Sequence, residues 1–231
     1  MNVTSAISKT SSTDISMDAS GSATKTVVII VAHPDDETLW AGGTIMVNSS
    51  WKCYVVCLCC KDDMEQASRF YKALKILKVQ GIMGDIKDGP EQKPLNVDDL
   101  ERKIISLLPP WHFDLIITHN PNGEYTSYIR YKETAKAVIN LWYKRKLSSS
   151  ELWTFAYEDG NKAYHPRPII QASVHQNFSV LTWLRKYIII TKTYGFKTNS
   201  FEAKTTPSSE AFWQYKRPED AYGLINQFKK L

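Results

Sequence analysis

One short segment of the chain combines an imidazole with three carboxylates. His33, Asp35, Asp36 and Glu37 fall within five positions, directly after the apolar run at 26–31. A strand that ends in such a cluster offers nitrogen and oxygen donors to a metal ion, and a bound metal lowers the pKa of a water ligand. These residue types therefore suggest a metal ion and an activated water.

The spacing within this segment suggests separate roles. His33 and Asp36 are three residues apart, which lets both side chains turn toward one point, and Asp35 can stay off the metal and act as a general base. The alternative is structural, with Asp35 or Asp36 capping a following helix and His33 as an ordinary loop residue. The residues alone leave both interpretations open.

Hydrophobic patterning predicts the elements that position this segment. Strands are expected at 26–31, 53–60, 113–118 and 152–157, helices at 38–47, 63–79, 98–108 and 131–142, and a Gly- and Pro-rich loop at 84–94. Nearer the C-terminus we expect a strand at about 169–172 and helices at about 179–190 and 218–229. This alternation predicts an α/β fold with a mostly parallel sheet and helices on both of its faces.

The chain is predicted to contain one domain. Residues 1–25 are rich in Ser and Thr and lack the basic-then-apolar order of a secretory signal, so we predict a disordered tail there. Residues 26–231 are enough for one sizeable core. No apolar run approaches the ~20 residues of a membrane span. We expect a cytoplasmic protein without an integral membrane segment.

Charge and cysteine content narrow the classes of partner. The net charge of +5 comes from 29 basic and 24 acidic residues spread along the chain, so no nucleic-acid partner is expected. All four cysteines lie within 53–60, on one predicted strand, where they are poorly placed to bridge each other. Buried thiols in a reducing compartment are the expected state.

Polar side chains follow four of the predicted strands. They occupy positions 33–37, 61–63, 119–120 and 158–159. In open sheets of this type, ligands bind outside the carboxyl ends of the strands. We therefore expect these four segments to contribute to one functional crevice.

Three motifs resemble the LmbE-like, PIG-L family of zinc-dependent N-acetylglucosamine deacetylases. They are segment 32–37, followed by Gly42 and Gly43, segment 118–125 and segment 155–160. The resemblance extends from about residue 26 to at least residue 213 and implies a Rossmann-like fold.

The resemblance also implies a mechanism. It assigns a mononuclear zinc ion to His33 and Asp36 and the role of general base to Asp35. Metal-bound water attacks the acetamide carbonyl in such enzymes, and the metal and a nearby donor stabilise the oxyanion. Acetate leaves, and a free amine remains on the sugar.

A second family motif departs from the pattern. The family carries His-x-x-His shortly after a Gly-x-Tyr segment, whereas Tyr128 and Tyr131 follow Tyr125 here. A phenol has a pKa of about 10 and must be ionised to act as a strong ligand, while a neutral imidazole binds at pH 7 without that cost. Zinc affinity and activity are therefore expected to be reduced.

We thus expect a metal-dependent hydrolase that removes an acetyl group from an N-acetylglucosamine-type conjugate, with reduced activity. One alternative is a catalytically impaired family member that binds amino-sugar conjugates, and another is a vestigial pocket in a protein that acts through a different surface. A small-molecule amino sugar or sugar conjugate is the expected partner, and a homo-oligomer is left open.

The site residues are assigned to three roles. They are Asp35, Tyr128 and Tyr125 for catalysis, His33, Asp36 and Tyr131 for Zn²⁺ or another divalent metal, and His119, Asn120, Glu124 and Arg130 for substrate binding. In place of Tyr131, the metal site could be completed by His119, Glu124 or Glu158.

Overall fold

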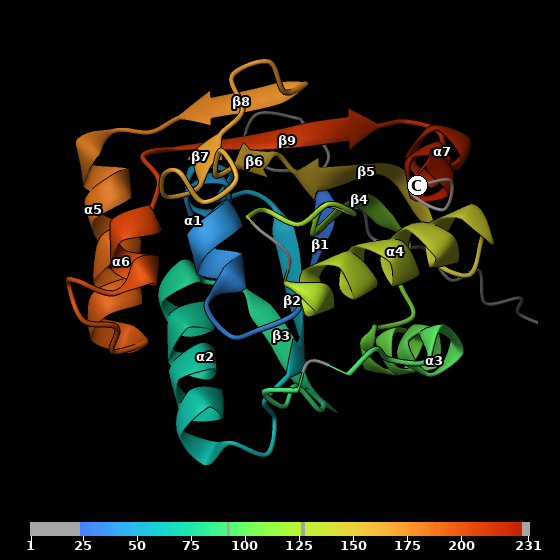
Figure 1. Cartoon of the computed structure of the whole chain (residues 1–231), viewed down its shortest axis with the longest axis horizontal. Coiled ribbons are helices and arrows are strands. Elements are labelled where there is room, and N and C mark those ends of the chain that lie inside the picture. Colours follow the sequence, from blue (N-terminus) through green and yellow to red (C-terminus); the bar gives the residue numbers. More distant parts are fainter. Residues whose placement is uncertain (1–23, 92, 126–127, 228–231) are drawn as a thin grey trace, which may run out of the picture.

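The computed structural model describes residues 24–91, 93–125 and 128–227 (Figure 1). Seven strands form one sheet in the order β3-β2-β1-β4-β5-β9-β8. The first five are parallel, β9 is antiparallel to β5, and β8 is antiparallel to β9. The predicted α/β fold with a mostly parallel sheet is confirmed.

The elements alternate along the chain. The strands are β1 (Thr26–Val31), β2 (Lys52–Cys59), β3 (Gln80–Ile86), β4 (Phe113–Thr118), β5 (Ser149–Phe155), β6 (Tyr157–Glu158), β7 (Arg167–Pro168), β8 (Val174–Asn177) and β9 (Ser209–Tyr215). The helices are α1 (Asp36–Val47), α2 (Met64–Leu77), α3 (Val97–Leu107), α4 (Ile129–Tyr143), α5 (Val180–Ile188), the π-helix η1 (Ile189–Thr193), α6 (Phe201–Thr205) and α7 (Pro218–Gln227). Strands β6 and β7 form a small separate antiparallel pair.

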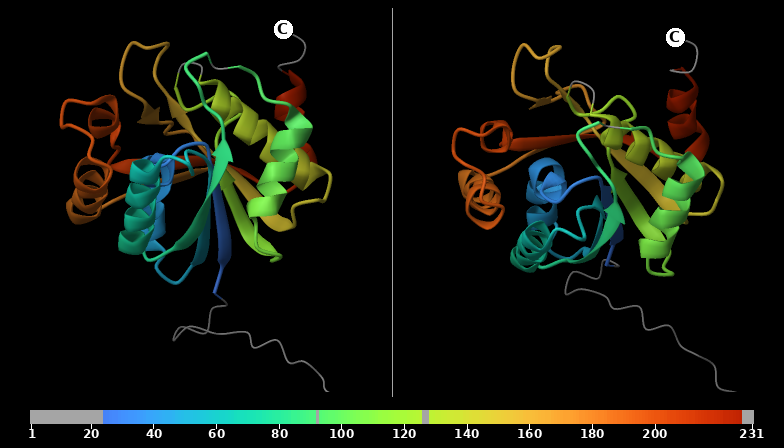
Figure 2. Two further views of the ribbon diagram at one scale, coloured as in Figure 1. Left: turned by 90° about the horizontal axis from the view of Figure 1, so that it is seen from below. Right: turned by 60° about the horizontal axis from the view of Figure 1, so that its bottom comes forward.

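Helices cover both faces of the sheet, as Figure 2 shows. Along β1, Val27 and Ile29 face a core built with α1, α2 and η1, while Val28 and Ile30 face a second core built with α3, α4 and α7. Successive side chains of a strand point to opposite faces, so β1 contributes to both cores. Both faces are buried, which explains the continuous apolar run of this strand.

Some sequence predictions are wrong at the two edges of the sheet. Strand β3 is not among the predicted strands, and its last residues, from Gly84 to Ile86, fall in the loop expected at 84–94. A Cβ at Gly81 would lie 2.4 Å from the carbonyl oxygen of Val55, and one at Gly84 would lie 2.7 Å from that of Leu58, so glycine permits the close approach of β2. Strand β9 was not predicted, and the strand expected near 169–172 is a turn, with β8 starting at Val174.

The predicted tail lies mainly outside the described residues, since residues 1–23 are not described. Lys25 is described and forms an ion pair with Glu151, above the rings of Trp51 and Trp153. None of the described helices combines the length and the apolar character that crossing a bilayer requires. All four cysteines are free thiols, as predicted, and only Cys60 is partly exposed.

Helix α1 is anchored to the sheet by a buried carboxylate. Glu210 on β9 accepts hydrogen bonds from the amides of Gly43 and Thr44, both at 2.8 Å, and lies 2.6 Å from Nζ of Lys186 on α5. The side chains of Glu210 and Lys186 are fully buried. A Cβ at Gly43 would lie 2.3 Å from the ring of Phe178, so glycine is needed for this packing.

Replacing Glu210→Ala should lower the free energy of unfolding by about 3–5 kcal/mol, because it leaves the Lys186 ammonium buried without its partner. Urea denaturation of both proteins measures this difference. The matched control is Asp220→Ala, which breaks the exposed ion pair with Arg217 and should leave stability nearly unchanged. Equal effects of the two substitutions would contradict this role of Glu210.

Candidate active site

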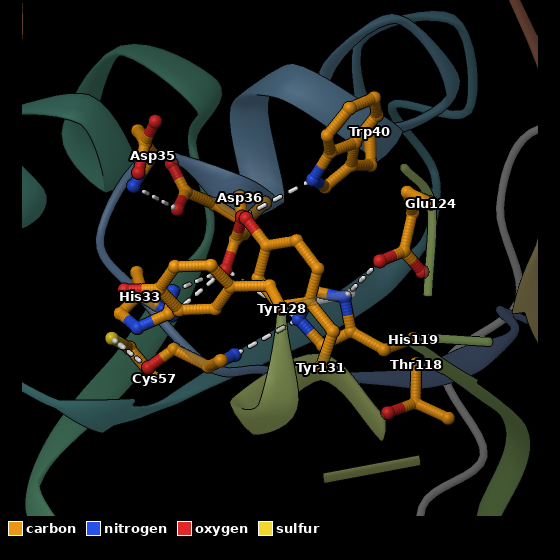
Figure 3. Close-up of polar contacts among 12 residues, drawn as sticks. His33, Asp35, Asp36, Trp40, Cys57, Thr118, His119, Glu124, Tyr128 and Tyr131 are labelled. Atoms are coloured by element: carbon orange, nitrogen blue, oxygen red, sulfur yellow. Dashed lines mark hydrogen bonds and ion pairs between the residues drawn. The ribbon is translucent and has the colours of Figure 1, made fainter. Parts of the chain in front are cut away.

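Most of the predicted site residues gather at the carboxyl ends of β1 and β4. These strands are parallel neighbours, while β2 and β3 continue the sheet on the other side of β1. Strand order reverses at this point, which is where doubly wound sheets bind ligands. Segment 33–37 follows β1 and segment 119–125 follows β4, and Figure 3 shows their side chains converging.

Asp35 has a strained backbone and a carboxylate that does not cap α1. Its φ is 102°, a left-handed conformation that costs a non-glycine residue about 1–2 kcal/mol. Its carbonyl oxygen accepts from the amides of Thr38 and Leu39, but its side chain makes no capping hydrogen bond. Burial, and then the charges of Asp36 and Glu37, raise the pKa of the Asp35 carboxyl well above its usual value.

Asp36 is the central acceptor of the site. Its Oδ1 accepts from the Tyr131 hydroxyl at 2.7 Å and from Nε1 of Trp40 at 3.1 Å, and its Oδ2 accepts from the amide of His33 at 2.8 Å. The side chain is almost fully buried. Although burial opposes ionisation, the rings of His119 and His33 hold the pKa of Asp36 well below its usual range.

His33 is held by Asp88, a residue that sequence reasoning missed. Nε2 of His33 lies 2.7 Å from Oδ2 of Asp88, which also accepts from the Tyr128 hydroxyl at 3.0 Å, and Nε of Arg130 lies 3.0 Å from Oδ1. Burial lowers the pKa of His33, but hydrogen bonds with Asp36 and Asp88 raise it to about 9. Asp88 follows the end of β3. Because that strand was not predicted, the position of Asp88 beside His33 was not predicted either.

His119, Asn120 and Glu124 lie beneath the site and brace its loops. His119 accepts from the amide of Ala32 through Nε2 (3.0 Å), and its Nδ1 lies 3.0 Å from Oε2 of Glu124. Oε1 of Glu124 accepts from the amide of Asn120, whose side chain donates to the carbonyl of Phe155. The ring of His119 also stacks on Tyr131, with 4.1 Å between centroids. The side chains of His119 and Glu124 are fully buried and bonded to each other.

The side chains around Asp36 do not fit a tetrahedral zinc ion as they stand. Nδ1 of His33 and Oδ2 of Asp36 are 3.5 Å apart and would suit two ligands of one ion. The third position holds Tyr131, whose pKa is raised well above its usual value by burial and then by Asp36, so it remains a proton donor. Among the described residues, no three His, Cys, Asp or Glu side chains are arranged to hold a metal.

The other side chains that could supply a third zinc ligand already have hydrogen-bond partners. Both ring nitrogens of His119 and both oxygens of Glu124 have partners within the protein. Glu158 lies on the β6–β7 pair, where it accepts from the Tyr164 hydroxyl. The structure thus brings His33, Asp36 and Tyr131 together, and the chemistry of Tyr131 leaves the expected zinc centre incomplete.

Comparison with known proteins identifies the family. Residues 28–142 match the family described as PIG-L: GlcNAc-PI de-N-acetylase. The chain belongs to the PIG-L family. Its curated relatives include an uncharacterized protein, L374, of Acanthamoeba polyphaga mimivirus, which is 23% identical over 145 residues. That similarity covers 57% of this chain and 61% of the viral protein, less than two thirds of its length.

Solved structures share the PIG-L fold of this chain. The N,N'-diacetylchitobiose deacetylase of Pyrococcus horikoshii has a TM-score of 0.60 at 14% identity, covering 83% of this chain and 84% of that one. The 4-carboxy-2-hydroxymuconate hydratase GalB of Pseudomonas putida has a TM-score of 0.57 at 14% identity, covering 84% and 97%. A zinc-inhibited form of teicoplanin deacetylase Orf2 has a TM-score of 0.57 at 13% identity, covering 78% and 88%. Because proteins with this fold include both deacetylases and a hydratase, the reaction depends on the residues of the site and not on the fold.

Replacing Tyr128→His together with Tyr131→His should create a zinc site. An imidazole in place of the Tyr131 phenol supplies a third neutral donor beside His33 and Asp36, so zinc affinity should rise at least ~tenfold. Metal titration followed by elemental analysis measures this change. The control is Tyr143→His at the exposed end of the same helix. If zinc affinity stays at the wild-type level, Tyr131 does not occupy the third ligand position.

Proposed function

We propose that this PIG-L protein binds N-acetylated amino-sugar conjugates and hydrolyses them far more slowly than a deacetylase with a complete zinc centre. The hydrogen bond from the Tyr131 hydroxyl to Oδ1 of Asp36, at 2.7 Å, carries this proposal. It places a bound proton beside the carboxylate that the family resemblance assigns to zinc. An acetamide is a poor electrophile, and its oxyanion then lacks the stabilisation that a metal supplies.

A polar hollow beside the site supports sugar binding. This cavity of about 350 Å³ is lined by residues 122–125 and 157–161, at the carboxyl ends of β4 and β5. Its amide and carboxylate groups suit sugar hydroxyls, and Tyr125 and Tyr157 offer aromatic faces. The hydroxyl of Tyr125 donates to that of Tyr131 at 3.4 Å, so a ligand in the hollow would lie next to the Asp36 cluster.

The substrate class is inferred from the family. Its description names a GlcNAc-PI de-N-acetylase, and one structural neighbour is named as a diacetylchitobiose deacetylase. Both names share an N-acetylated glucosamine linked to a second group. An N-acetylglucosamine conjugate is therefore the ligand that we propose for this chain.

Asp35 supports the slow N-deacetylation that forms part of this proposal. Its carboxylate has a raised pKa, makes no helix cap and lies at the switch point of the sheet. As a general base it would take a proton from water as the water oxygen attacks the acetamide carbon. The C–N bond would then break, with the proton passing to the amine and acetate leaving.

Isothermal titration with N,N'-diacetylchitobiose and with N-acetylglucosaminyl-inositol phosphate should give saturable binding. In parallel, the rate of free-amine release should lie far below the turnover of roughly 1–10³ per second that is typical of enzymes. Turnover in that ordinary range would overturn the proposed impairment. The absence of binding to either compound would overturn the binding role.

Replacing Asp35→Asn should leave binding unchanged and reduce any remaining amine release by about 10²-fold or more, because the base is lost. Titration and the amine assay on the same preparation separate the two effects. The control is Asp98→Asn, an exposed carboxylate on α3 outside the segments assigned to the site. Unchanged amine release in Asp35→Asn would remove Asp35 as the base.

A further inference from the structure

An apolar stripe lies exposed along helix α5. Val180, Leu181, Leu184 and Ile188 are between 42% and 79% exposed. Their spacing places all four on one side of the helix. Such side chains cost free energy in water unless something covers them, and a continuous stripe of this kind marks an interaction surface.

The stripe continues into an apolar groove. This cavity of about 540 Å³ lies between the C-terminal parts of α1 and α2 and the junction of α5 with η1. Ile45, Met46, Ile76 and Ile189 contribute to its walls, and Ile188 belongs to both the groove and the stripe. In Figure 2 these helices lie on the same side of the sheet.

The charges around the groove all have one sign. Lys78 and Arg185 are among its thirteen lining residues, none of which is acidic. Lys72 and Lys75 are exposed on the same helix as Ile76. A second copy of the chain seated on this face would present the same basic residues and no acidic groups from the groove, so self-association would bring like charges together.

We propose that the α5 stripe and this groove dock the protein on an anionic lipid bilayer. A bilayer offers acyl chains to the stripe and the groove, and phosphate groups to Lys78 and Arg185, so it complements both features at once. An amphipathic helix of this kind lies in the interface rather than crossing it. This role is independent of the function proposed for the Asp36 cluster.

Co-sedimentation with vesicles tests the proposal. The wild-type protein should partition onto vesicles of equal parts phosphatidylglycerol and phosphatidylcholine, and less onto phosphatidylcholine alone. Leu181→Ser with Leu184→Ser should lower partitioning by about tenfold or more, because two apolar side chains no longer enter the bilayer. Lys78→Gln with Arg185→Gln should lower binding to the anionic vesicles on the order of tenfold, and added salt should act likewise.

The matched control is Val97→Ser with Ile105→Ser, which removes two similarly exposed apolar side chains from α3 on the other face. Its partitioning should equal that of the wild type, and circular dichroism should show that every variant is folded. Failure of the wild type to bind anionic vesicles would overturn the proposal. So would undiminished binding by the α5 variant, or a wild-type dimer in solution that this variant converts to monomer.

Discussion

The buried carboxylate of Asp36 is the interaction on which the site depends. It accepts hydrogen bonds from the backbone after β1, from the first turns of α1 through Trp40, and from α4 through Tyr131. A buried charge is tolerated only where such partners replace its lost hydration. One side chain thus joins three elements, and the proton held by Tyr131 contributes to their stability.

The same requirement governs the other buried acids. Glu124 is paired with His119 and a backbone amide, Asp88 with His33 and Arg130, and Glu210 with Lys186 and two amides of α1. Asp88 and Glu210 join segments far apart in the sequence, whereas Glu124 holds the loop after β4 together locally. Buried acids whose partners are satisfied in this way hold the side chains of the site in fixed positions.

The Asp36 cluster and the apolar groove lie at opposite ends of the parallel strands. The Asp36 cluster and the polar hollow lie at the carboxyl ends of β1, β4 and β5. The apolar groove lies near the amino-terminal ends of β2 and β3, where Trp51, Cys53 and Val79 contribute to it. The apolar groove can therefore contact a surface without covering the polar hollow.

The sequence by itself determined the α/β class, strands β1 and β4 with their bounds, and the placement of His33, Asp35 and Asp36 at a strand end, because these depend on local apolar runs and short spacing. Strand β3 was not predicted, because glycines are uncommon in strands, and Asp88 after it was missed as well. These glycines are tolerated because β2 approaches β3 closely, which only the tertiary structure shows. The tertiary structure alone showed that the Asp35 side chain does not cap α1, that Asp88 holds His33, and that Tyr131 donates to Asp36. Hydrogen bonds between distant segments depend on how the whole sheet and its helices pack, so no local sequence pattern predicts them.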